Sequence, residues 1–123
     1  MTKTIILIPS RLAATRLPNK PLLKINGISI INHVYEKAKS SKIGEVFVAT
    51  GDQEIFEEVT KKGGNCILTK NDHQTGTYRI FEAYEKLYLK FYLFQKLLKK
   101  QQELPLLFCL SQRNPWFFII MVV

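Results

Sequence analysis

Three short apolar stretches in the first part of the chain have the character of buried β-strands. Thr4–Pro9 is a continuous apolar run rich in Ile, and Glu45–Thr50 and Asn65–Thr69 are similarly short and largely apolar. Runs of this length without polar alternation are typical of strands that are buried on both faces. We therefore predict three strands in this part of the chain.

Segments with helical spacing of apolar residues separate these strands. Residues 30–41 and 53–62 place apolar side chains three or four positions apart, and Ser29 and Asp52 stand where N-caps are expected. A third helix is expected to be capped by Thr77. Strands that alternate with helices imply right-handed crossovers and a parallel sheet. The pattern therefore predicts an α/β fold with a mainly parallel sheet.

Two polar loops leave the carboxyl ends of the predicted strands. One spans Pro9–Pro21 and the other spans Lys70–Gly76. Ligands of parallel α/β sheets bind at the carboxyl ends of the strands. We therefore expect both loops to face one pocket, although some fifty residues of sequence separate them.

The chain changes character after about Glu85. Residues 84–100 still have helical spacing, but from Leu104 onward neither alternation nor a helical period holds. We therefore predict two parts, residues 1–85 and an aberrant, partly helical tail over residues 86–123. Three strands without further partners leave an open edge, so we expect the sheet to be incomplete.

The formal net charge of +8 is unevenly distributed. Residues 1–85 carry 12 basic and 9 acidic side chains, whereas residues 86–123 carry 6 basic and 1 acidic. Because the front of the chain is nearly balanced, we expect no nucleic-acid partner. A basic module that binds nucleic acid or a membrane surface through its tail remains an alternative.

The cysteines and the apolar segments bear on the compartment. Cys66 and Cys109 have neither C-x-x-C nor metal-ligand spacing, which favours reduced thiols in a reducing compartment. The apolar run that ends at Pro9 is too short for a signal peptide. Ser111–Pro115 interrupts the apolar end of the chain, so neither half can span a bilayer. We therefore expect a cytoplasmic protein without a membrane partner.

The first polar loop concentrates positive charge. Arg11 and Arg16 can donate forked hydrogen bonds to phosphate oxygens, and Lys20 can add a point charge. Pro18 and Pro21 stiffen the loop and so lower the entropy lost when these charges are held together. Phosphate is the first candidate ligand, and several cations around a triphosphate could also stabilise the charge on a leaving pyrophosphate. The alternative, of about equal weight on composition alone, is a solvated loop whose arginines pair with surface acids.

The second polar loop offers uncharged groups to a ligand. Gly76 allows a close backbone approach, Gln74 is both donor and acceptor, and the free amides at the start of the third helix suit an anion or a base carbonyl. Asp72 and His73 have two interpretations, a metal or acid–base role and a turn with a surface histidine. His33, within the first predicted helix, is expected to pack or to act as a cap.

Three motifs carry a resemblance to a known family. They are Ile6–Arg11, Thr15–Pro21 and Asp72–Thr77, in that order. The first motif alone resembles sugar nucleotidyltransferases broadly, and the combination resembles 3-deoxy-manno-octulosonate (Kdo) cytidylyltransferases, also called CMP-Kdo synthetases. The similarity covers about residues 3–83.

The resemblance implies a three-layer, Rossmann-like nucleotide-diphospho-sugar transferase fold, with residues 1–85 as its nucleotide-binding part. The implied reaction converts CTP and Kdo to CMP-Kdo and pyrophosphate with Mg²⁺, for lipopolysaccharide synthesis. Arg11 and Lys20 would be catalytic. The implied nucleotide-binding residues are Pro9, Ser10, Arg11, Thr15, Arg16, Lys20, Gln74, Thr75, Gly76, Thr77 and Arg79.

The chain also departs from the family pattern. Tyr78 stands where the family has an acidic residue, and the Gln-Gly-Asp-x-Pro motif whose aspartate binds magnesium is absent, so no metal ligand is assigned. The part that binds Kdo in the family is absent as well. We therefore expect a truncated copy, active or inactive, with CTP and Kdo as its small-molecule partners. The alternatives are a non-catalytic CTP-binding fragment and another sugar nucleotidyltransferase, such as a CMP-acylneuraminate synthetase. A family-like homodimer stays open.

Overall fold

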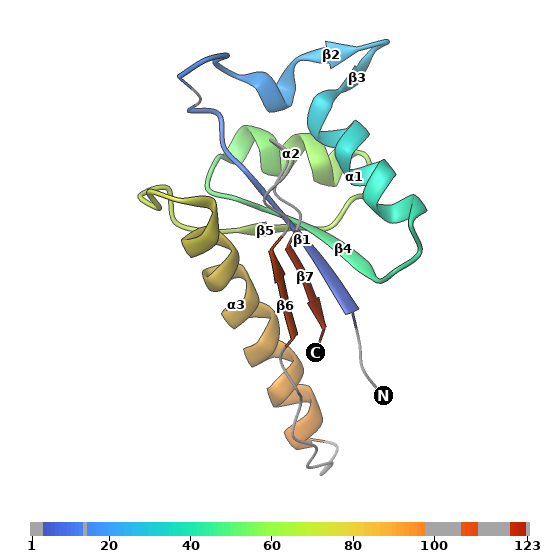
Figure 1. Cartoon of the computed structure of the whole chain (residues 1–123), viewed down its shortest axis with the longest axis vertical. Helices are drawn as coiled ribbons and strands as arrows, with labels where there is room; N and C mark the ends of the chain where they lie inside the picture. The colour runs from blue at the N-terminus through green and yellow to red at the C-terminus, as the bar shows by residue number, and fades with distance from the viewer. Residues whose placement is uncertain (1–3, 14, 98–106, 111–118, 123) are drawn as a thin grey trace.

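The structure is a computed structural model that describes residues 4–13, 15–97, 107–110 and 119–122. Strands and helices alternate over most of this range, as the sequence predicts (Figure 1). The elements are β1 (Thr4–Ser10), the 3₁₀ helix η1 (Lys20–Leu22), β2 (Lys24–Ile25), β3 (Ile28–Ser29), α1 (Ile30–Ser40), β4 (Glu45–Thr50), α2 (Gln53–Lys61), β5 (Cys66–Leu68), α3 (Gly76–Leu97), β6 (Leu107–Leu110) and β7 (Ile119–Val122).

The main sheet has five strands in the order β5-β4-β1-β7-β6. Strands β5, β4 and β1 are parallel, which confirms the predicted parallel sheet. Their register pairs Ser10 with Thr50 and Thr50 with Leu68. The three carboxyl ends therefore lie level in one row, and the loops that follow them start side by side.

Helices cover the parallel strands on both faces, which gives the predicted three layers (Figure 1). Alternate residues of each strand point to opposite faces, so Ile6 and Ile8 of β1 pack toward α1 and α2, and Leu7 packs toward α3. A fully buried Leu side chain such as Leu7 contributes about 2 kcal/mol to stability. The larger core joins the buried residues Ile6, Ile8, Ile31, Tyr35, Ala38, Val46, Val48, Ile55 and Val59, and the smaller joins Leu7, Ala49, Ile80 and Ala83.

The structure corrects the expectation of an open three-stranded sheet. Strand β7 pairs antiparallel with β1, and β6 pairs antiparallel with β7. Neither strand was predicted, because the strands that they pair with are set by contacts far apart in the sequence and not by a local pattern. The free edge of β1 presents unpaired N–H and C=O groups, which a β-prone run of Ile, Met and Val can pair. The sheet is therefore mixed, with its antiparallel part formed by the end of the chain.

Helix α3 begins earlier than the sequence predicts. It runs without a break through residues 85 and 86, where we predict the boundary between the two parts, and that boundary stays a prediction. The predicted helical residues 98–100 lie outside the described residues. The expected cap at Thr77 is wrong: the Thr75 hydroxyl accepts the Tyr78 amide at 3.4 Å, and Thr77 lies inside the helix. A cap must precede the first helical residue, and that residue is Gly76.

A small hairpin joins η1 to α1. Strands β2 and β3 meet at Asn26 and Gly27, whose φ angles of 51° and 78° suit a tight two-residue turn. The imidazole Nε2 of His33 lies 2.9 Å from the Ile25 carbonyl oxygen, so His33 ties α1 to this hairpin. His33 is exposed and lies inside α1, so it neither packs in the core nor caps the helix as expected. None of the helices in the described part of the chain is both long and apolar enough to cross a membrane.

Candidate functional site

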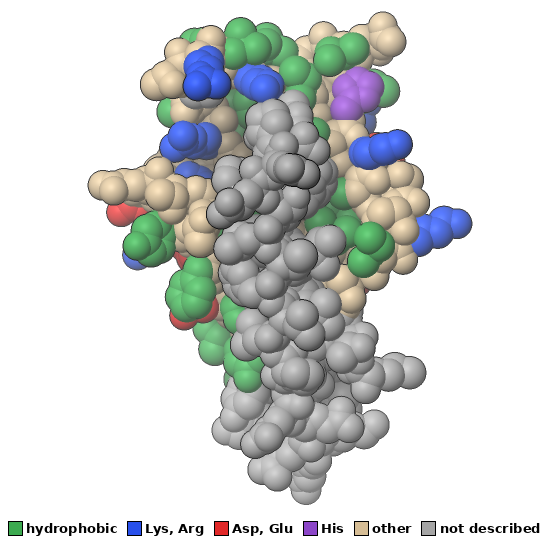
Figure 2. Space-filling view, in the orientation of Figure 1, with side chains coloured by type: hydrophobic (Ala, Val, Ile, Leu, Met, Phe, Trp, Pro, Cys, Tyr) green, Lys and Arg blue, Asp and Glu red, His purple; other side chains and the backbone are tan. Residues whose placement is uncertain are grey.

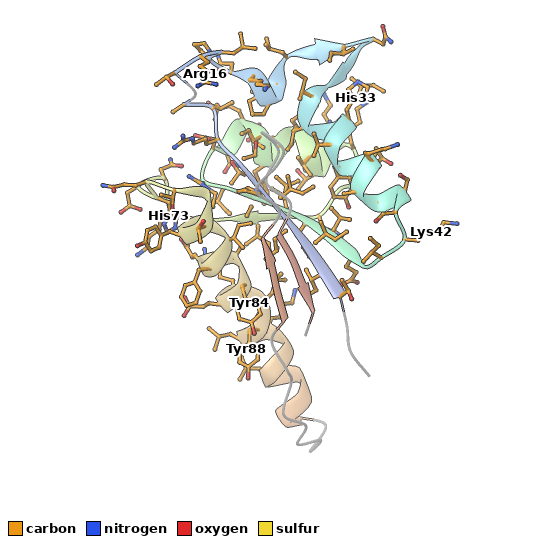
Figure 3. The ribbon with its side chains drawn as sticks, viewed as in Figure 1. Arg16, His33, Lys42, His73, Tyr84 and Tyr88 are labelled. Atoms are coloured by element: carbon orange, nitrogen blue, oxygen red, sulfur yellow. The ribbon has the colours of Figure 1, made fainter. Side chains whose placement is uncertain are left out.

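Two loops form the candidate site at the carboxyl edge of the parallel strands. The first loop, residues 11–19, follows β1, and the second loop, residues 69–75, follows β5. Figure 3 shows Arg16 on the first loop and His73 on the second, on the same side of the molecule. At Gly76, a Cβ atom would lie 3.5 Å from the Cβ and Cγ of Pro9, which is ordinary van der Waals contact. The start of α3 therefore packs against the end of β1, as the expected shared pocket requires.

Backbone hydrogen bonds close the first loop into a compact unit. The Asn19 amide donates to the Leu12 carbonyl at 3.2 Å, and the Leu22 amide donates to the Asn19 carbonyl at 2.9 Å. Asn19 has a φ of 57°, a left-handed conformation that Asn tolerates better than most residues. Pro21 is buried at the start of η1. The loop thus returns to its own base before the chain enters η1.

The basic side chains of this loop lie at the surface. Arg11 and Arg16 are exposed and Lys20 is half-buried. Figure 2 shows Lys and Arg side chains grouped on the upper left of the drawn face, where Figure 1 places the loop after β1. Guanidinium groups in such a position can donate bidentate, charge-assisted hydrogen bonds to phosphate oxygens. The structure thus keeps the predicted phosphate-binding groups accessible to a ligand.

Asp52 holds the base of the first loop. Its carboxylate oxygen Oδ2 accepts the backbone amide of Leu12 at 2.8 Å. The sequence places Asp52 at the N-cap of α2, and it occupies that position, but its side chain makes no cap hydrogen bond. The carboxylate is therefore used between two segments rather than within its own helix.

Glu82 holds the second loop. Its two carboxylate oxygens lie 3.3 and 3.2 Å from the amide nitrogen of Lys70. The carboxylate also pairs with Nε2 of His73, and with Nζ of Lys86 at 2.9 Å. Burial acts to raise the pKa of Glu82, but the hydrogen bonds from His73, Lys86 and Lys70 outweigh it and lower the pKa to about 2. Glu82 is therefore ionised at neutral pH and neutralised by its own neighbours.

The pairing with Glu82 bears on the two interpretations of His73. The imidazole is bonded to a carboxylate nine positions along the chain and its side chain is only 18% exposed, so His73 is partly buried and not a surface histidine. Within residues 4–13, 15–97, 107–110 and 119–122, no three His, Cys, Asp or Glu side chains group so that they could hold a metal ion. Asp72 is exposed beside this pair.

Gly51 lets the second loop approach the end of β4. A Cβ atom on Gly51 would lie 2.1 Å from Oδ1 of Asn71, 2.7 Å from Nη1 of Arg79 and 2.8 Å from the Lys70 carbonyl oxygen. These separations are too short for any side chain larger than hydrogen. Gly51 and Asp52 are adjacent, so one dipeptide directly after β4 supports both loops.

Arg79 lies beneath the loops. It is only 4% exposed, and its Nη1 donates to the Thr69 hydroxyl at 3.0 Å. Burial lowers the pKa of Arg79. The negative charge of Asp52 raises this pKa and the positive charge of Arg11 lowers it, so both charges act on Arg79. A nucleotide-binding role for Arg79 stays a prediction, and its observed contact is structural.

The other predicted site residues border the same edge of the sheet. Pro9 and Ser10 are half-buried at the end of β1, and Thr15 is exposed in the first loop. The remaining members, all exposed at the start of α3 or just before it, are Gln74, Thr75, Gly76 and Thr77.

Sequence reasoning missed the residues that hold the loops in place. Asp52 was assigned to a helix cap, and neither Gly51 nor Glu82 was given a contact with a loop. Gly51 had a local signal, since a glycine at the carboxyl end of a buried strand often marks a close approach of backbone. Glu82 also had a local signal: it lies four positions before Lys86, a spacing that favours an ion pair on a helix. That spacing does not predict the contacts with Lys70 or His73.

Comparison with known proteins agrees with this geometry. A family model described as cytidylyltransferase matches residues 5–107. The chain is 52% identical over 86 residues to a 3-deoxy-manno-octulosonate cytidylyltransferase of Rhodopseudomonas palustris, covering 70% of this chain and 35% of that protein. It is 50% identical over 86 residues to the protein of the same description from Nitrobacter hamburgensis, covering 70% of this chain and 33% of that protein.

A solved structure is similar as well. It is that of CMP:2-keto-3-deoxy-manno-octonic acid synthetase complexed with CTP, with 46% sequence identity and a TM-score of 0.62 over 67% of this chain and 34% of the other. The chain thus spans about a third of the length of the curated relatives that it matches. Because the family match extends over most of the chain and the α/β fold agrees with it, the chain belongs to the cytidylyltransferase family.

Proposed function

We propose that the chain binds CTP between its two loops, as the nucleotide-binding part of a Kdo cytidylyltransferase. The observation that carries the proposal is the packing of Gly76 against Pro9, since it brings the start of α3 beside the end of β1 and its basic loop. A helix N-terminus and a basic loop at the carboxyl edge of a parallel sheet are together suited to a phosphorylated ligand. The solved relative in complex with CTP supports the choice of nucleotide.

The proposed roles follow from the chemistry of each loop. Arg11, Arg16 and Lys20 would hold the triphosphate, and Arg11 and Lys20 would also stabilise the charge that develops on the leaving pyrophosphate. Gln74 and the amides at the start of α3 would bind the cytosine and ribose. Pro9, Ser10 and Thr15 would line the nucleotide from the side of β1, and Thr75 and Thr77 from the side of α3. Arg79 would act from below, through the loops that it supports.

The proposed reaction is transfer of CMP to Kdo. A hydroxyl of the sugar attacks the α-phosphorus of CTP in line. The bond between the α-phosphorus and the oxygen that bridges it to the β-phosphate breaks, and pyrophosphate leaves. The resemblance supports a role for this reaction in lipopolysaccharide synthesis. The relatives are described as 3-deoxy-manno-octulosonate cytidylyltransferases, which supports Kdo as the acceptor rather than another sugar acid.

A magnesium ion is expected for the family. Among the described residues no three His, Cys, Asp or Glu side chains group so that they could hold a metal ion, and none of these residues is assigned to magnesium. The second candidate function, a non-catalytic CTP-binding fragment, is favoured by the same observation. Both candidates require CTP binding, and they differ in whether CTP and Kdo yield pyrophosphate.

Calorimetric titration of the chain with CTP, with and without Mg²⁺, tests the proposal. The informative variant is Arg16→Asn, and its matched control is Lys42→Asn, which removes one positive charge before the amino end of β4. Figure 3 shows Lys42 on the side of the molecule opposite Arg16. Lys42 has a φ of 55°, which Asn accepts, so the control leaves the backbone unstrained.

We expect CTP to bind with or without added magnesium, and Arg16→Asn to weaken binding about tenfold by removing a charge-assisted contact. Lys42→Asn should leave the affinity unchanged. Equal losses in both variants would show that only net charge matters, and would contradict a site at the loops. Release of pyrophosphate when Kdo and magnesium are added would then separate the enzyme from the non-catalytic fragment.

A further inference from the structure

Asp52 has an unusual arrangement for a residue at a helix N-cap. Its carboxylate makes no hydrogen bond to the amides of α2, and Oδ2 instead accepts the amide of Leu12, 40 positions earlier in the sequence, at 2.8 Å. N-cap aspartates ordinarily satisfy the free amides of their own helix. The side chain is thus committed to the loop after β1 at the expense of its own helix.

The Leu12 peptide is the base of the first loop. Its amide is held by Asp52, and its carbonyl accepts the Asn19 amide at 3.2 Å. Arg11 lies directly before this base, and Lys20 follows Asn19 directly after it. The Asp52 carboxylate therefore fixes the backbone that is flanked by Arg11 on one side and, through Asn19, by Lys20 on the other.

The charge of Asp52 argues against a direct role in binding an anion. Burial lowers the pKa of Arg79 and Asp52 raises it, so the negative charge of Asp52 acts at the edge where the basic loop lies. A carboxylate in that position repels a phosphate group. Any benefit of Asp52 to anion binding must therefore come from the conformation that it imposes on the loop.

We infer that Asp52 is a positioning residue for the nucleotide, which holds the Leu12 peptide so that Arg11 and Lys20 are presented to the triphosphate. The inference rests on the proposed binding of CTP at the first loop. It predicts different effects for two substitutions at one position, because charge and hydrogen bonding can be removed separately. Asp52→Asn removes the charge and keeps an oxygen that can accept the Leu12 amide, whereas Asp52→Ala removes both.

The matched control is Glu54→Ala. Glu54 is an exposed acid in the first turn of α2, so its removal costs the helix the same favourable interaction with its N-terminal dipole. All three variants are compared with the wild-type chain in two measurements. The first is hydrogen exchange of the Leu12, Asn19 and α2 amides by NMR without nucleotide, and the second is the affinity for CTP.

In the first measurement we expect Asp52→Ala to speed exchange of the Leu12 and Asn19 amides about tenfold, with the α2 amides unchanged. Asp52→Asn and Glu54→Ala should exchange like the wild type. Unchanged Leu12 exchange in Asp52→Ala, or an equal loss of protection throughout α2, would overturn the positioning role. This result does not depend on nucleotide, so it stands apart from the failure of CTP binding itself.

In the second measurement Asp52→Ala should bind CTP about tenfold more weakly, and Asp52→Asn should bind as tightly as wild type or up to about threefold more tightly. Tighter binding by both variants would show that Asp52 acts by charge alone and would overturn the inference. If the wild-type chain fails to bind CTP, the proposed function fails, and a positioning role for CTP fails with it. The exchange data would then report only whether Asp52 orders the loop.

Discussion

The two loops of the candidate site are anchored alike at their starts. In each, the backbone amide two residues beyond the strand is held by a helix carboxylate: Leu12 by Asp52 and Lys70 by Glu82. An amide that leaves a sheet loses its strand partner, and a buried amide without a partner costs stability. A carboxylate that replaces this partner fixes the path of the loop from its first turn.

Beyond their starts the loops differ. In the second loop Glu82 binds His73 and also pairs with Lys86, so these charges are satisfied within the protein. In the first loop Arg11 and Arg16 are exposed. In the proposed site, the first loop would bring charge to a ligand, and the second would bring shape and the uncharged polar groups of Gln74 and Thr75.

The strongest test of the second loop is Gly51→Ala. The added Cβ would lie 2.8 Å from the Lys70 carbonyl oxygen, so the backbone of the loop must move. We expect the free energy of unfolding to fall by about 3 kcal/mol, in the range of overpacked cores. Urea denaturation measures this change. The control is Gly76→Ala, whose Cβ would make ordinary contact with Pro9, and equal midpoints for the two variants would refute a close approach at Gly51.

A smaller effect is expected from Glu82→Gln. The pKa of Glu82 is about 2 in the folded chain and 4.5 as the ordinary value, so its contribution to stability is complete above about pH 4.5 and is lost as the pH falls toward 2. At pH 7 the variant should lose about 1 kcal/mol, since half-exposed Lys86 leaves the pair partly screened by water.

Denaturation at several pH values checks this prediction. The stabilities of wild type and Glu82→Gln should converge as the pH falls from 4.5 to 2. The control is Glu85→Gln, which changes an exposed acid of the same helix and should leave the pH dependence unchanged. A gap between wild type and Glu82→Gln that stays constant down to pH 2 would show that Glu82 holds the second loop by packing and not by its charge.

The smallest effect is expected at the start of α3. Thr75→Ala removes the hydroxyl that accepts the Tyr78 amide at 3.4 Å, and should cost about 0.5 kcal/mol, at the weak end of N-cap losses. Thr77→Ala should cost nothing or add slightly to stability, because Thr77 lies within the helix, where Ala has the higher helix propensity. Thermal denaturation of both variants ranks them, and a larger loss in Thr77→Ala would restore the cap that the sequence predicts.

The parallel part of the fold could be predicted because its signals are local. Apolar runs such as Thr4–Pro9 and the spacing over residues 30–41 each depend on neighbours in sequence, and the structure places β1 and α1 there. Strands β6 and β7 could not be predicted. Strand β7 pairs with the free edge of β1, more than 100 residues earlier, and β6 pairs with β7, so neither pairing has a local signal in the sequence.

The same reasoning applies to the site. Arg11, Arg16 and Lys20 predict anion binding without any structure, since the side chains themselves carry the charges. The roles of Asp52 and Glu82 depend on which backbone amide each carboxylate reaches. The amide that each carboxylate reaches follows from the register of the sheet, which cannot be predicted from the sequence.

The central claim is that CTP binds between the two loops, and mapping of amide chemical shifts during a CTP titration tests it most directly. The account predicts that the amides of residues 9–20 and 74–79 shift together and saturate with one dissociation constant. The amides of residues 37–44, at the opposite edge of the sheet, should stay in place. Shifts confined to the basic tail, or spread evenly over all exposed amides, would contradict a nucleotide site at the carboxyl edge of the parallel strands.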